Sequence, residues 1–92
     1  MAADSGRISR EFDDSSVEFL FTELDVAFTF LELARTAHGS ETARRNNNHA
    51  RVAYETVIGF IPRLNLTEAE LQAIQVKLGM LRQRLCAAGC DV

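Results

Sequence analysis

Residues 17–37, which read VEFLFTELDVAFTFLELARTA, decide the fold of this chain. At about 100° per residue of an α-helix, their apolar side chains sweep roughly 240° of the helix surface. A surface helix of a globular protein needs an apolar stripe only a little wider than about 100°. We therefore expect this helix to be covered on several sides, in part by a partner or a second copy. The apolar positions are Phe19, Leu20, Leu24, Val26, Ala27, Phe28, Phe30, Leu31, Leu33 and Ala34.

These apolar positions divide into a stripe that a three-helix core would bury and further apolar side chains that such a core does not need. A three-helix core would use the stripe formed by Leu20, Leu24, Ala27, Leu31 and Ala34. The remaining apolar side chains are predicted to form a protein interface, and the simplest partner is a second copy, which gives a homodimer. This predicted interface consists of Phe19, Val26, Phe30 and Leu33, flanked by Phe21 and Phe28.

Composition narrows the class of protein. The chain has 92 residues, enough for one domain with a modest core, and it is 47% hydrophobic and 25% charged, as expected of a globular chain. Its net charge of −3 argues against a general nucleic-acid binder. The polar, acidic beginning does not resemble a signal peptide, and no apolar run is long enough to span a membrane, so we expect a cytoplasmic protein.

The charges are unevenly distributed along the chain. Residues 11–32 contain only acidic charges, whereas basic residues outnumber acidic ones over residues 35–63. One interpretation is that the charges lie on solvated helix faces with some pairing between helices. The other is electrostatic matching between two subunits that lie antiparallel.

Helix start and stop signals divide the chain into three helices. The first is expected to begin at Ser15 or Ser16, with Glu18 completing a capping box, and to end before Gly39. The second follows Ser40 as N-cap and ends near residue 60, because Pro62 cannot lie in a straight helix interior. Its Asn46–Asn48 run is either a frayed first turn or a second place for the helix to start.

The third helix has the clearest start signal. Thr67 and Glu70 form a capping box directly before a periodic apolar run, and Gly89 is the expected stop. No segment alternates as a half-buried strand does. The sequence therefore predicts an all-α protein, either a three-helix antiparallel bundle or a helical hairpin capped by the third helix. Residues 1–14 are expected to form a flexible arm, residues 15–88 the helical domain, and residues 89–92 a C-terminal tail.

The first two helices resemble a tetratricopeptide-type hairpin, in which large and small residues alternate so that antiparallel helices approach closely. In the second helix, Ala50, Tyr54, Val57 and Pro62 of this chain resemble the family's pattern of small, aromatic, small and proline residues. In the first helix, the residues that resemble the family's pattern are Phe30, Leu33, Ala34 and Ala37. Val57 replaces the usual Ala, Ala37 replaces an aromatic residue, and the connection is about four residues longer than in the family. The resemblance implies a protein-binding scaffold whose single repeat needs a cap.

Candidate chemical groups are few. Cys86 and Cys90 supply two thiols where a zinc site takes four ligands, so we expect free thiols, and no cofactor or metal. A polar cluster at the start of the second helix is either solvated or a site for an anion or RNA. Its basic members are Arg44, Arg45, His49 and Arg51. Arg44 and His49 also resemble the Arg-x4–6-His motif of HEPN-type ribonucleases, which implies that the His acts at the scissile phosphate while the Arg stabilises charge.

The function predicted from the sequence is therefore a small helical interaction module without catalytic activity. The partner is a second copy or another protein, and neither a membrane nor nucleic acid is expected. Anion or RNA binding, or HEPN-like ribonuclease activity through Arg44 and His49, is the alternative.

Overall fold

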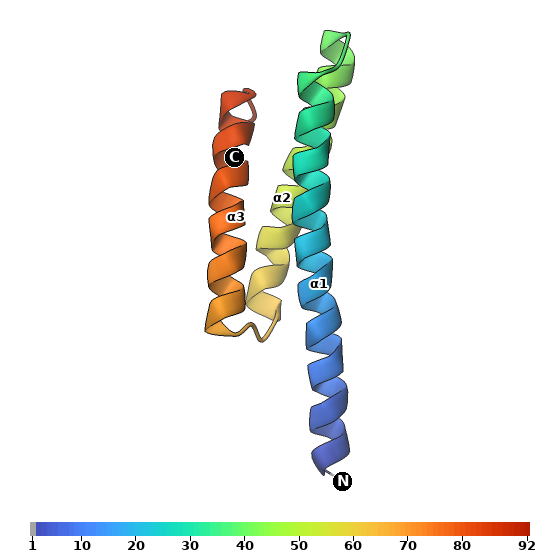
Figure 1. Cartoon of the computed structure of the whole chain (residues 1–92), viewed down its shortest axis with the longest axis vertical. Coiled ribbons are helices and arrows are strands. Elements are labelled where there is room, and N and C mark those ends of the chain that lie inside the picture. The colour runs from blue at the N-terminus through green and yellow to red at the C-terminus, as the bar shows by residue number, and fades with distance from the viewer. Residues whose placement is uncertain (1) are drawn as a thin grey trace.

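The computed structural model describes the backbone of residues 2–92 and the side chains of residues 15–92. It contains the helices α1 (Ala2–Arg35), α2 (Ser40–Phe60) and α3 (Glu68–Ala87), and a short 3-10 turn, η1 (Ile61–Arg63), follows α2. The helices run up, down and up, and residues 2–92 contain no strand (Figure 1). The predicted all-α, three-helix architecture is confirmed. None of the described helices is both long and apolar enough to cross a bilayer.

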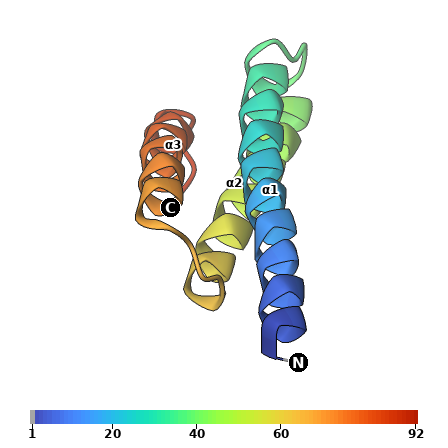
Figure 2. The same ribbon diagram turned by 60° about the horizontal axis from the view of Figure 1, so that its bottom comes forward.

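The two longest helices pair side by side, and α3 lies against one side of this pair (Figures 1 and 2). The chain measures 58 × 19 × 16 Å, because the first turns of α1 extend beyond the α2–α3 connection (Figure 1). One side of the α1–α2 pair is therefore covered within the chain, and the opposite side is not covered by a described helix.

A narrow core joins the three helices. All five residues of the predicted core stripe of α1, which are Leu20, Leu24, Ala27, Leu31 and Ala34, are buried. Small residues at Ala27, Ala50 and Ala53 let the backbones of α1 and α2 approach closely. The other core members are Val57 of α2 and Ile74, Leu81 and Leu85 of α3.

The start of α1 differs from the prediction. The backbone is already helical from Ala2, so Ser15 is an interior residue and not the N-cap. Residues 2–14 contain no proline, and a helix held by the α1–α2 pairing extends readily into preceding residues that tolerate it. The expectation of a flexible arm over residues 1–14 depends on side chains that lie outside the described part of the structure.

The start of α2 also differs. Gly39 is the N-cap and has no side-chain cap, whereas Ser40, the expected cap, is the first helical residue. The Asn46–Asn48 run lies inside the helix and marks neither a fray nor a second start. The end of α2 is confirmed at Phe60, and Pro62 lies in the first turn of η1, where its missing N–H is not needed.

Both predicted ends of α3 are confirmed. The Thr67 hydroxyl accepts from the Glu70 N–H at 3.1 Å, and the Glu70 carboxylate accepts from the Thr67 N–H at 2.9 Å. At the other end, Gly89 has φ of 89°, and the N–H groups of Gly89 and Cys90 donate to Cys86 and Leu85. This Schellman arrangement turns the last residues back, so Cys90 and Val92 contact the core.

Candidate interaction surface

The flank of α1 that faces α3 is protected by long cationic side chains. Lys77 Nζ lies 5.4 Å from the centre of the Phe21 ring, and the Arg84 guanidinium lies 5.5 Å from that of Phe28. Lys77 also pairs with Asp25, and Arg84 with an acidic residue one turn after Phe28. The aliphatic stems of such cations cover apolar surface while their heads remain in water. Phe21 and Phe28, predicted as flanks of the interface, are thus half-buried within the chain.

The Arg84 partner is Glu32, which also accepts two hydrogen bonds from Arg35, at 3.2 and 2.8 Å. The hydrogen bonds from Arg35, together with that from Arg84, hold the pKa of the Glu32 carboxyl below its usual value. Glu32 thereby links the exposed end of α1 to α3.

The opposite flank of the α1–α2 pair carries large apolar side chains that no described helix covers. Two aromatic contacts mark this flank. The rings of Phe19 and Phe60 meet edge to face at 5.7 Å, and the ring of Phe30 lies 4.9 Å from the imidazole of His49. We call the surface around these contacts the outer face. It consists of Phe19, Val26, Phe30 and Leu33 of α1 with Val52 and Phe60 of α2.

Exposure on the outer face is high for residues of this size. Phe19 is 43% exposed, Leu33 49%, Val52 48% and Phe60 38%, and Val26 and Phe30 are half-buried. The four predicted interface residues of α1 that are not flanking positions therefore lie on one surface. Successive members are seven, four and three residues apart, which places them along one side of the helix.

Three charged or titratable residues accompany the outer face, and the acidic one lies at the opposite end from the other two. Glu23 lies on α1 near the Phe19–Phe60 contact, between Phe19 and Val26 in the same line of residues. His49 lies at the other end, and Arg45 is one turn before it on α2. One end of the outer face is thus acidic and the other basic.

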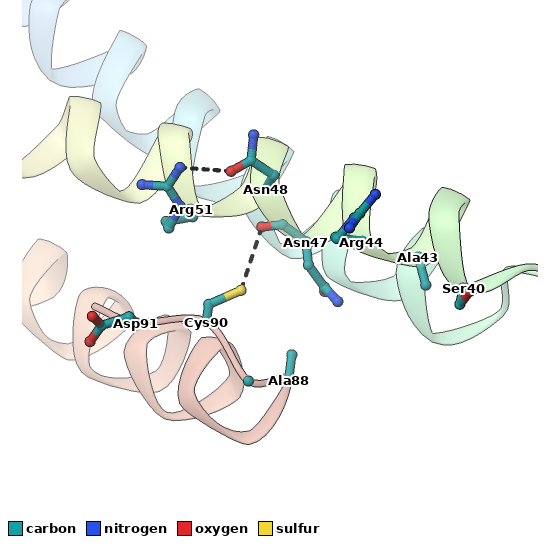
Figure 3. A pocket seen from close by; sticks show the side chains of 10 residues that line it. Ser40, Ala43, Arg44, Asn47, Asn48, Arg51, Ala88, Cys90 and Asp91 are labelled. Atoms are coloured by element: carbon teal, nitrogen blue, oxygen red, sulfur yellow. Dashed lines mark hydrogen bonds between the residues drawn. The ribbon is translucent and has the colours of Figure 1, made fainter.

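A cavity of about 610 Å³ lies between the first half of α2 and the C-terminal turn of α3. Figure 3 shows the residues that line it, with Arg44, Asn47 and Arg51 on one side and Cys90 and Asp91 on the other. Arg51 donates to Glu55 at 2.9 Å and to Asn48 at 2.7 Å. Its charge is therefore partly neutralised within the chain.

The structure divides the predicted anion-binding residues between two surfaces. Arg44 and Arg51 line the cavity, whereas His49 stacks on Phe30 at the outer face. Arg45 pairs weakly with Glu41, at 3.9 Å. Five residues along a helix turn the direction of a side chain by about 140°, so Arg44 and His49 point to different flanks. The geometry gives no support to a shared site of the HEPN type.

The two cysteines are free and have different surroundings. Cys86 is exposed, and Cys90 is half-buried with its thiol 3.9 Å from the backbone oxygen of Asn47 (Figure 3). Cys90 therefore belongs to the turn that ends α3. Among the described side chains, no three His, Cys, Asp or Glu residues are grouped so that they could hold a metal ion.

Sequence reasoning missed the α2 half of the outer face. Val52 and Phe60 were not predicted as interface residues, although the spacing between Phe60, Ala53 and His49 places Phe60 near the side of α2 that meets α1. The only available signal was an aromatic residue directly before the expected helix end. No sequence signal indicated that Lys77 and Arg84 would lie over the rings of Phe21 and Phe28, because these contacts join residues far apart in the chain.

Comparison of this chain with protein-family models, with curated proteins and with solved structures finds no match.

Proposed function

We propose that this chain is a protein–protein interaction module without catalytic activity, and that it associates with a second copy through its outer face. One observation carries the proposal: four large apolar side chains, 38–49% exposed, gather on the flank of the α1–α2 pair opposite α3. Contiguous exposed apolar surface of this kind typically marks an interaction site. The resemblance to a tetratricopeptide hairpin supports the same class of function.

The contrast between the two flanks of α1 strengthens this proposal. On the α3 side, the Phe21 and Phe28 rings have cations over them, so water contact is already reduced. On the outer face, Phe19 and Phe60 meet edge to face and remain 43% and 38% exposed. Because burying apolar surface contributes about 25 cal/mol per Å², the outer face gains more from a partner than the flank that faces α3.

Leu33→Glu tests the proposal, with Val76→Glu as its matched control. Both residues are exposed apolar side chains within helices, at 49% for Leu33 and 59% for Val76, but Val76 lies on α3. Light scattering over a concentration series should show a dimer for the wild type and for Val76→Glu, and a monomer for Leu33→Glu. Circular dichroism checks that each variant remains helical.

Two results would overturn the proposal. A wild-type chain that remains monomeric at high micromolar concentration would show that the chain does not associate with a second copy. A dimer that Leu33→Glu and Val76→Glu leave equally intact would place the interface elsewhere.

A further inference from the structure

We propose that the second copy docks antiparallel to the first, with α1 against α1 and the two-fold axis passing beside Val26, so that Glu23 of each copy lies beside His49 of the other. This inference rests on the proposed function and adds the orientation of the partner and the residues that specify it. It concerns the outer face alone.

The first argument is the position of Glu23. This carboxylate is half-buried in the line that contains Phe19, Val26 and Phe30. Within residues 15–92, Glu23 forms no ion pair with a described side chain. A partner that covers the outer face must also cover Glu23, and removing a carboxylate from water is costly unless a cation or a hydrogen-bond donor meets it. A suitable partner therefore presents such a group at this level.

The second argument is the level of each residue along the helices. Phe19 meets Phe60, and eleven residues further along α1 and eleven back along α2, Phe30 meets His49. The two helices thus keep one antiparallel alignment. In this alignment His49 lies level with Phe30, and Arg45, four residues earlier on α2, lies level with Ala34.

A two-fold axis beside Val26 turns this alignment into complementary pairs. Val26 is the midpoint between Phe19 and Leu33, so the axis places Phe19 against Leu33 of the second copy and aligns the apolar surfaces. The same rotation brings His49 of the second copy to within one residue, about 1.5 Å, of the level of Glu23. An isologous interface requires this reciprocity, in which each copy supplies both halves of a pair.

The alternative to the antiparallel arrangement also places the two outer faces together, but with α1 of one copy over α2 of the other and the two-fold axis parallel to the helices. Like groups then lie at equal levels, and Glu23 faces Thr56 of the second copy. The Thr56 hydroxyl already donates to the backbone oxygen of Val52 at 2.8 Å. That arrangement leaves two covered carboxylates without a free hydrogen-bond donor, so the pairing of Glu23 with the His49 imidazole favours the antiparallel one.

Charge reversal tests the pairing. Glu23→Lys and His49→Glu should each weaken self-association by about tenfold or more, because the first removes the acceptor that His49 meets and the second places two carboxylates together in the interface. An equimolar mixture of the two variants should recover a heterodimer of near wild-type affinity, measured by analytical ultracentrifugation or native mass spectrometry. Its two contacts are then Lys–Glu at one end and the original His–Glu at the other. Glu68→Lys, an exposed residue at the start of α3, is the matched control and should leave affinity unchanged.

A cross-link provides a second test that does not alter charge. Val26→Cys, in a chain with Cys86→Ser and Cys90→Ala, should form an intermolecular disulfide under mild oxidation, because only the antiparallel arrangement brings position 26 against itself. Val76→Cys in the same background should cross-link far more slowly.

The outcomes separate this inference from the proposed function. A monomeric wild type overturns both. A wild-type dimer that forms through the outer face, but whose charge-reversed variants bind normally or fail to recover on mixing, overturns the antiparallel pairing alone. Absence of a Val26→Cys cross-link in a dimer that Leu33→Glu disrupts has the same meaning.

Discussion

Leu81→Ala tests whether α3 is held on the α1–α2 pair as described. Leu81 is 0% exposed and belongs to the core cluster, so truncation removes about three methylene equivalents from a fully buried site. At about 0.8 kcal/mol per methylene the transfer loss is about 2.4 kcal/mol. The cavity that remains adds to this, and the expected loss of unfolding free energy is about 3–4 kcal/mol.

Urea unfolding followed by circular dichroism measures this loss, at a concentration where the chain is monomeric. With an m-value of about 1.2 kcal/mol/M for a small chain, the midpoint should fall by about 2.5–3.3 M. Met80→Ala is the matched control, because this neighbouring α3 side chain is 54% exposed, and its cost should be about 0.5 kcal/mol. Equal effects of the two substitutions would refute the packing of α3 described above.

Three further predictions concern the ends and links of the helices. Thr67→Ala should lower the unfolding free energy by about 1 kcal/mol because it removes the α3 cap, whereas Ser40→Ala should have almost no effect, since α2 lacks a side-chain cap; urea unfolding of both variants decides this. Gly79→Ala should raise the unfolding free energy by about 0.5–1 kcal/mol, because Gly79 lies inside α3 and an added Cβ there meets no neighbouring atom. Gly89→Ala should lower the unfolding free energy by about 1 kcal/mol or more, because φ at this position is 89°. Urea unfolding measures both, and two changes of the same sign would contradict this prediction. The stability advantage of the wild type over Glu32→Gln should be present at neutral pH and should be lost as pH falls through the lowered pKa of that carboxyl, because the unfolded chain binds the proton first; unfolding curves of both proteins at several pH values test the sign.

Local sequence features determined the helices and several of their ends. The capping box at Thr67 and Glu70 and the stop at Gly89 were predicted because the bonds involved join residues only a few positions apart. The buried stripe of α1 was predicted for a similar reason, since helical periodicity alone places Leu20, Leu24 and Leu31 on one side. The start of α1 was missed because Ser15 and Glu18 form a plausible cap signal inside a longer helix, and nothing local shows that the helix continues through it.

The sequence by itself determined that α1 carries more apolar surface than one core can use. Only the tertiary structure decided which part of that surface remains open. Lys77 and Arg84 of α3 cover Phe21 and Phe28, so the excess is concentrated around Phe19 and Leu33 on the outer face. The physical reason is that helical periodicity is a property of one segment, whereas the choice between two apolar flanks depends on the side against which a distant helix packs.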